Sequence, residues 1–285
     1  MQSSNFQIDA VDTGIFGLDG GSMFGTVPKT LWSKIYNPGD ELNRIPLAAR
    51  PMLVRWDGKN LLVDTGNGNK WNEKLASIYN IDVRKSSVEK ALSPFGLSPG
   101  DIDYVILTHL HFDHAGGATS KGENGEIAPT FPNARYFVQK EQLEWARKSN
   151  TKEKPSFLTE NFEPLIAEGV LETIDGSGEL FPGFEVIPSF GHTFALQMVK
   201  VSTGSHTFIY VSDLSPTAAH IPPNYYMGYD NNALVVIEEK KKLISEAYED
   251  GWIVVFEHDA FLQASTVIST ERGFRNGEPI TLTTF

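Results

Sequence analysis

Three of the seven histidines in this 285-residue chain fall within the run 109–114, which reads HLHFDH. The run follows the apolar stretch 104–108 (YVILT) and precedes an alanine and two glycines, small residues that allow a tight backbone turn. Side chains at a strand end with such a turn behind them can converge on one point. Imidazole nitrogens and carboxylate oxygens are the ligands expected for zinc, manganese or iron(II). The run therefore predicts a metal site with the ligands His109, His111, Asp113 and His114.

Three further candidates lie in the second half of the chain. His192, Asp213 and His258 each follow an apolar stretch that reads as a strand. Residues just past buried strands lie where the active-site loops of layered α/β folds gather. Taken alone, each of the three is also compatible with a structural or surface role. The run 109–114 supplies too few ligands for two ions, and its presence favours a ligand role for all three.

The elements that must position these side chains alternate between strands and helices. Residues 51–64 predict a hairpin with Asp-Gly at its turn, and Ser86 with Glu89 forms a capping-box pattern that opens a helix ending near Gly96. The other predicted strands are 104–108, 135–138, 184–188, 197–201, 207–212 and 252–256, and the other helices are 140–148 and 232–249. This order favours an α/β sandwich, with helices outside two sheets, formed by a single domain over residues 1–285.

Composition limits the partners of the chain. The net charge of −12 repels nucleic acid and anionic membrane surfaces, so neither is expected as a partner. The sequence has no cysteine, so any metal must be bound by nitrogen and oxygen. The first twenty residues lack a basic start followed by an apolar segment, and no apolar run reaches the length of a membrane span. We therefore expect a soluble, cytoplasmic protein.

The segment 108–117 (THLHFDHAGG) resembles, without a gap, the HxHxDH motif of the metallo-β-lactamase-fold hydrolases. The three later candidates fall in the order of that family, and Asp64-Thr65-Gly66 matches its upstream aspartate, which is structural. The resemblance implies a four-layer αβ/βα sandwich and two divalent ions, expected to be zinc, with manganese, iron or cobalt as alternatives. It also implies the assignment of the ligands. One ion would be held by His109, His111 and His192, the other by Asp113, His114 and His258, with Asp213 as the bridge.

Within the family, the stretches 20–32 and 212–220 resemble quorum-quenching lactonases of the YtnP-like subgroup and, more distantly, methyl parathion hydrolase. The resemblance implies that a metal-bridging hydroxide opens lactone rings, in particular those of N-acyl homoserine lactones. Asp113 and Asp213 are the candidates for relaying the proton. Acyl-homoserine lactonases have a tyrosine three residues after the bridging aspartate, where this chain has Pro216. The run 191–196 (GHTFAL) also departs from the common GHTPGH. Substitute proton donors are Tyr225, Tyr226 and His220.

An acyl-lactone substrate needs an apolar channel near the metals. Large apolar residues flank the predicted metal loops, and ordinary core packing is the alternative role for all of them. The candidates for substrate contact are Met23, Phe24, Trp32, Phe112 and Phe194, together with His220.

Several other functions use the same kind of site. A phosphotriesterase of the methyl parathion hydrolase type would direct the same hydroxide at phosphorus. Glyoxalase II is disfavoured because only 27 residues follow His258, where that enzyme has a helical tail that binds glutathione. A β-lactamase is disfavoured because those enzymes generally have another residue where this chain has His114. A nuclease is disfavoured because the chain is negatively charged. A non-catalytic metal-binding or ligand-sensing protein is the alternative of another class, and a complete ligand set argues against it. A homodimer, with the N-terminal segment at the interface, is compatible with the resemblance.

Overall fold

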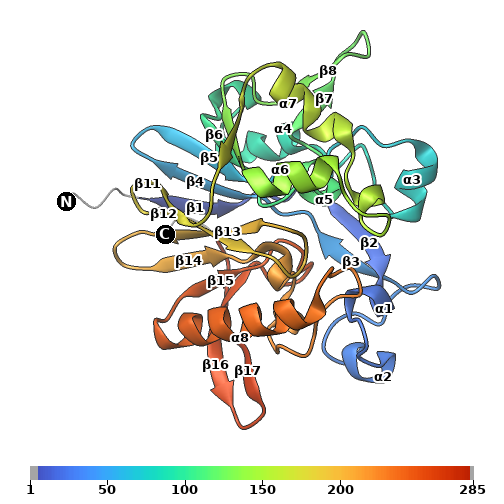
Figure 1. Cartoon of the computed structure of the whole chain (residues 1–285), viewed down its shortest axis with the longest axis vertical. Coiled ribbons are helices and arrows are strands. Elements are labelled where there is room, and N and C mark those ends of the chain that lie inside the picture. The colour runs from blue at the N-terminus through green and yellow to red at the C-terminus, as the bar shows by residue number, and fades with distance from the viewer. Residues whose placement is uncertain (1–5, 283–285) are drawn as a thin grey trace. The chain divides into compact units, whose positions relative to one another are not determined.

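The computed structural model describes residues 6–282 (Figure 1). Their contacts divide into two compact units. Unit 1 contains residues 6–15 and Ala49–Gly176, and unit 2 contains Phe16–Ala48 and Ser177–Leu282. Each unit holds one large sheet with its own helices, as expected for an α/β chain. The single domain over residues 1–285 stays a prediction.

Unit 1 is built on a six-stranded sheet in the order β1-β4-β5-β6-β9-β10. The first three strands pair antiparallel and the last four pair parallel. A short hairpin lies outside this sheet. The strands are β1 (Gln7–Ala10), β4 (Met52–Trp56), β5 (Lys59–Val63), β6 (Tyr104–Ile106), β9 (Arg135–Gln139) and β10 (Leu171–Ile174), with β7 (Thr119–Lys121) and β8 (Ile127–Pro129) in the hairpin.

The helices of unit 1 pack their apolar residues on this sheet. Leu92, Leu143 and Leu165 join Leu62 and Val105 of the strands in one buried core. Burial of such side chains stabilises each by about 1.5–3 kcal/mol relative to exposure. The helices are α3 (Glu73–Ile78), α4 (Val88–Leu92), α5 (Phe112–Ala115), α6 (Lys140–Arg147) and α7 (Glu163–Ala167), with 3-10 turns at Ser93–Phe95, Pro99–Asp101, Lys154–Ser156 and Thr159–Asn161.

Two local predictions in unit 1 have different outcomes. The hairpin is confirmed as β4–β5, and Asp57 and Gly58 take the positive φ values of 46° and 73° that its two-residue turn requires. The predicted helix start at Ser86 is wrong by one residue. Ser87 is the N-cap, because its Oγ accepts a hydrogen bond from the backbone N–H of Lys90 at 3.3 Å.

Unit 2 is built on a seven-stranded sheet in the order β11 to β17. All neighbours pair antiparallel except β14 and β15, which are parallel and joined through α8. The strands are β11 (Gly178–Phe181), β12 (Phe184–Ser189), β13 (Leu196–Ser202), β14 (Thr207–Tyr210), β15 (Ile253–Val255), β16 (Ala264–Thr270) and β17 (Gly273–Ile280), with β2 (Ile15–Asp19) and β3 (Arg44–Ala48) in a separate two-stranded ladder.

The long helix α8 (Ala233–Glu249) covers one face of this sheet. Asn232 caps it by accepting a hydrogen bond from the N–H of Val235, so the helix predicted over 232–249 is confirmed. Val236 and Ile244 pack with Ile209 of β14 in the core of the unit. The remaining helical segments are α1 (Gly20–Met23), α2 (Lys29–Trp32) and 3-10 turns at Ser212–Leu214 and Ala218–His220. Among residues 6–282, no helix has both the length and the apolar character to cross a membrane.

Candidate metal centre

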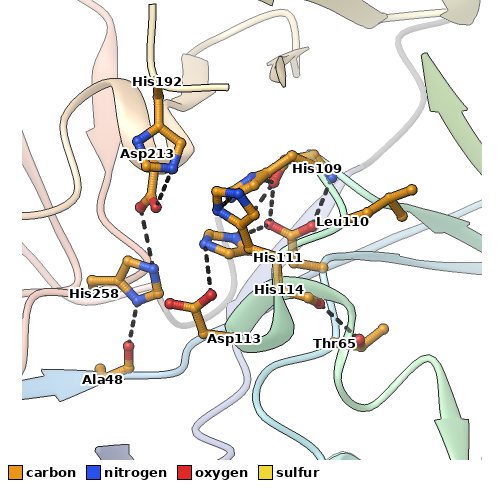
Figure 2. A network of polar contacts seen from close by, with 12 residues as sticks. Ala48, Thr65, His109, Leu110, His111, Asp113, His114, His192, Asp213 and His258 are labelled. Carbon is orange, nitrogen blue, oxygen red and sulfur yellow. Dashed lines mark hydrogen bonds and ion pairs between the residues drawn. The ribbon is translucent and has the colours of Figure 1, made fainter. Parts of the chain in front are cut away.

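The HLHFDH run of unit 1 leaves the end of β6 and closes into the single helical turn α5. His109 and His111 precede α5, Asp113 and His114 lie on it, and all four are buried. Thr65 fixes this turn, since both its N–H and its hydroxyl donate to the carbonyl of His114 at 2.8 Å (Figure 2). The four predicted ligands are therefore held by the short segment after β6 and the helical turn that follows it.

The glycines after the run are required by close backbone packing. A Cβ atom on Gly116 would lie 2.2 Å from the carbonyl oxygen of Asn67, and one on Gly117 would lie 2.3 Å from that of Thr65. Both separations are far below van der Waals contact. The chain can bring the metal loop this close to the segment after β5 only because these two residues lack side chains.

Asp64 joins the end of β5 to the metal loop. One carboxylate oxygen accepts from the backbone N–H of Thr108 at 2.7 Å. The other accepts from the Thr108 hydroxyl at 2.7 Å and lies 3.1 Å from Nδ1 of His114. Asp64 is fully buried at a φ of 62°, a conformation that its hydrogen bonds must maintain. These contacts support the structural role that the resemblance implies for Asp64.

The outer nitrogens of His109 and His111 face proton acceptors. Nε2 of His111 lies 2.9 Å from the buried carboxylate of Glu153. Nδ1 of His109 lies 3.1 Å from the hydroxyl of Thr108, whose hydrogen is directed to Asp64. Both outer nitrogens therefore carry the ring proton, and the inner atoms, Nε2 of His109 and Nδ1 of His111, present lone pairs only 3.1 Å apart. Two lone pairs at this distance repel unless a cation or an additional proton lies between them.

Unit 2 contains a second group of the same kind around Asp213. Figure 2 shows His192 and His258 directed at its carboxylate, with Nε2 atoms 3.1 Å and 3.2 Å from Oδ2 and Oδ1. Nδ1 of His258 donates to the carbonyl of Ala48 at 2.8 Å, and Nδ1 of His192 faces Asp230 at 2.8 Å. With a proton on Nδ1, each Nε2 faces a carboxylate oxygen, and this arrangement requires a positive charge at Nε2, either a second ring proton or a metal ion.

The electrostatics of His192 agree with a bound cation. Burial alone would lower the pKa of His192, but Asp213 and Asp230 outweigh burial and raise it to about 10. The metal-free chain thus attracts a positive charge to this position. A divalent cation would supply the same positive charge, and the imidazole and carboxylate groups of both clusters are ligands that suit zinc and related ions. The residues present therefore fit a metal centre.

Sequence reasoning missed Glu153 and Asp230. Both are buried carboxylates that orient a predicted ligand, and Glu153 also accepts from the indole N–H of Trp145 at 2.7 Å. They lie 42 and 38 residues from the histidines they contact. No spacing or motif sets them apart from the other 34 acidic residues among the 36 of the chain, so no signal in the sequence identified them.

Four of the residues predicted to contact substrate lie in the core of unit 2. Met23, Phe24, Trp32 and His220 are at most 1% exposed. Phe24 stacks between Trp32, at 5.2 Å, and His220, at 4.5 Å. Both nitrogens of His220 are bonded, Nε2 to the carbonyl of Met23 and Nδ1 to the hydroxyl of Thr217. This is the ordinary packing weighed above as the alternative, and contact with substrate stays a prediction.

The other candidates lie nearer to the surface. Phe112 is 7% exposed and packs against Trp71, and Phe194 is 39% exposed and contacts Phe190. The proposed donor Tyr226 exchanges a hydrogen bond with the hydroxyl of Thr26 at 2.9 Å. Tyr225 meets the ring of Phe24 edge to face.

Similarity to known proteins agrees with this chemistry. A family model of the metallo-β-lactamase superfamily matches residues 46–250. An N-acyl homoserine lactonase of Bacillus cereus is 26% identical over 233 residues, which span 78% of this chain and 84% of the relative. A probable metal-dependent hydrolase from Staphylococcus aureus is 30% identical, with a TM-score of 0.86 over 99% of this chain and all of the other.

A third relative is similar in fold. The dizinc quorum-quenching lactonase AidC, solved with the product N-hexanoyl-L-homoserine, has a TM-score of 0.78 at 20% identity, over 99% of both chains. These comparisons confirm the predicted α/β metallo-β-lactamase fold. The chain belongs to the metallo-β-lactamase superfamily and is a metal-dependent hydrolase of that superfamily.

Proposed function

We propose that this chain opens lactone rings, in particular those of N-acyl homoserine lactones, with two divalent metal ions, zinc by preference. The observation that carries the proposal is the shared orientation of the histidines. Outer partners hold the ring proton on the far side of each of His109, His111, His192 and His258, so the inner nitrogens are ready to bind metal. The lactonase relatives supply the substrate class.

The proposed ligands form two groups. As the resemblance implies, the first ion would be held by His109, His111 and His192, and the second by Asp113, His114 and His258. Asp213 has two carboxylate oxygens, one toward His192 and one toward His258, which suits the bridging role that the resemblance gives it.

When bound, such a pair of ions lowers the pKa of a shared water and polarises the carbonyl of the substrate. The residues of the chain complete the reaction. Water adds its oxygen to the carbonyl carbon, the ring C–O bond breaks, and the departing alkoxide takes up a proton. We assign the proton transfer to Asp113 or Asp213, because both carboxylates lie beside the proposed ligand nitrogens and Pro216 offers no donor.

The experiment is a pH-stat assay of zinc-loaded protein with N-hexanoyl-L-homoserine lactone. Turnover should be lost with a chelator, return with zinc, and fall at least about a hundredfold in Asp113→Ala. Asp175→Ala, which alters an exposed carboxylate, is the matched control and should keep full activity. Protein with two bound ions that turns over paraoxon but no lactone would replace this proposal with a phosphotriesterase, and inactivity on every ester would favour a metal-binding protein.

A further inference from the structure

Tyr79 presents an accessible hydroxyl beside the metal loop of unit 1. The residue is half-buried, and its hydroxyl makes no hydrogen bond with any group of residues 6–282. Nor is this hydroxyl one of the enclosed polar atoms of that part of the chain, so it stays open to solvent. An open donor of this kind can bind a ligand group without first breaking a contact within the protein.

Contacts of the ring and the backbone hold Tyr79 in place. Its ring lies 4.9 Å from that of Phe112 and 5.6 Å from that of Trp71, which it meets edge to face. Trp71 is itself fixed, since its indole N–H donates to the carbonyl of Asn67 at 2.8 Å. The backbone N–H of Tyr79, at the C-cap of α3, donates to the carbonyl of Leu75 at 3.0 Å. The hydroxyl is therefore held ready for a ligand by contacts that do not involve it.

The contact with Phe112 brings Tyr79 close to the predicted ligands of unit 1. Phe112 stands between His111 and Asp113 in the chain. Burial raises the pKa of Tyr79, and the negative charge of Asp113 raises it further. The field of a predicted metal ligand therefore reaches the hydroxyl. Because both causes disfavour the phenolate, the hydroxyl stays protonated at neutral pH and can donate a hydrogen bond.

Tyr79 also adjoins apolar surface. Trp71 and Leu75 form part of the wall of a cavity of about 360 Å³ between the segments 67–75 and 157–161. Leu75 precedes Tyr79 by four residues, the spacing of side chains on one face of a helix. Tyr79 thus neighbours a predicted metal ligand, Asp113, as well as side chains against which an alkyl chain can pack.

The substrate class of the proposed function has a polar group that fits this position. An N-acyl homoserine lactone has an amide carbonyl between its ring and its acyl chain. When the ring carbonyl lies at the metal ligands and the chain lies against apolar side chains, the amide carbonyl falls between the two. We propose that the Tyr79 hydroxyl donates a hydrogen bond to this amide carbonyl and thereby selects acylated lactones. The inference rests on the proposed function and names a residue that recognises the amide.

The test compares two substrates of the zinc-loaded protein, N-hexanoyl-L-homoserine lactone and α-heptyl-γ-butyrolactone, in which two methylenes replace the amide. Tyr79→Phe keeps the ring and removes only the hydroxyl. Its kcat/KM for the acylated lactone should fall about three- to tenfold, while its kcat/KM for the heptyl lactone should equal that of the parent protein. Tyr248→Phe, which alters an exposed tyrosine of α8, is the matched control and should change neither value.

Titration with the γ-lactam analogue of the N-hexanoyl lactone measures the same contact without turnover. The lactam keeps the amide carbonyl, so its affinity should fall about three- to tenfold in Tyr79→Phe and stay unchanged in Tyr248→Phe. An equal fall in kcat/KM for both lactones would show that Tyr79 acts only through packing on the metal loop. Unchanged kinetics on the acylated lactone would show that the hydroxyl does not contact it, and either result would overturn the assignment. If the parent protein hydrolyses neither lactone, the proposed function is wrong, and the titration still decides the Tyr79 contact.

Discussion

Nε2 of His258 lies 3.2 Å from Oδ1 of Asp213, while Nδ1 of the same ring lies 2.8 Å from the carbonyl oxygen of Ala48. A backbone carbonyl can only accept, so Nδ1 carries a proton and Nε2 is the nitrogen that faces the carboxylate. This contact is favourable with a second proton on Nε2 or with a metal ion in place of that proton. The outer partners of the histidines therefore determine which nitrogen binds metal, and removing one of them should weaken the centre even though no ligand is lost.

Asp230→Asn should weaken metal binding at His192 by about 10–100-fold. An asparagine can turn its NH₂ group toward Nδ1 of His192, which would move the ring proton to Nε2, the atom that must bind metal. The measurement is zinc content after dialysis against a graded chelator. Glu238→Gln, an exposed carboxylate on α8, is the control and should retain zinc like the parent protein. Equal retention by Asp230→Asn would show that Asp230 does not orient His192.

Glu153→Gln should weaken the other half of the centre. Glu153 accepts from two N–H groups, those of His111 and Trp145, and a glutamine can accept from only one of them through its single oxygen. We expect a loss of about 1–3 kcal/mol in the free energy of unfolding, measured with urea, together with lower zinc retention. Glu144→Gln on the surface of α6 should change neither quantity. A stable variant that keeps its zinc would contradict the role of Glu153.

Elements whose signals lie in neighbouring residues were predicted from the sequence, whereas features that depend on contacts between residues far apart in the chain were not. The hairpin β4–β5 and the helix α8 were predicted well because Asp57-Gly58 and Asn232 carry their signals at the turn and at the cap. The HLHFDH run was equally easy to recognise because four residues that can bind a metal lie within six positions of the sequence. Its one-turn helix was not predicted, since α5 is too short for any hydrophobic period and depends on contacts with Thr65.

The outer partners of the histidines carry no such local signal. Glu153 and Asp230 become informative only when the chain folds them against His111 and His192. The same reason explains the cluster of Phe24 and His220, which read equally well as a substrate pocket or as core. Composition identifies an apolar side chain but does not say which of its neighbours will cover it.

The stability of the protein should depend on pH through His220. Burial, together with the positive charge of Lys240, lowers the pKa of His220 from 6.5 to about 3. Between these values the unfolded chain binds a proton that the folded chain does not, so stability falls as the pH drops below 6.5. Between pH 7 and pH 5 the parent protein should lose about 2 kcal/mol more than His220→Gln. Urea unfolding at both values measures this, and His206→Gln, an exposed histidine, should follow the parent protein.

Lys70 should stabilise the metal loop from behind. Its ammonium donates to the carbonyls of Gly116 and Thr119, which follow α5 in the chain, at 2.5 Å each, and the residue is half-buried. Lys70→Met keeps the length of the side chain but removes both hydrogen bonds, so we expect a loss of about 1–3 kcal/mol in the free energy of unfolding.

The carbonyl of Gly116 that Lys70 contacts lies next to the predicted metal ligands in the chain. Gly116 directly follows the turn that carries Asp113 and His114, so loosening it should also reduce zinc retention in Lys70→Met. Lys74→Met alters an exposed lysine only four residues away and provides the matched control for both measurements. If Lys70→Met lost stability but kept its zinc, the ammonium would support the loop after α5 without positioning the ligands, and the coupling between the two would be wrong.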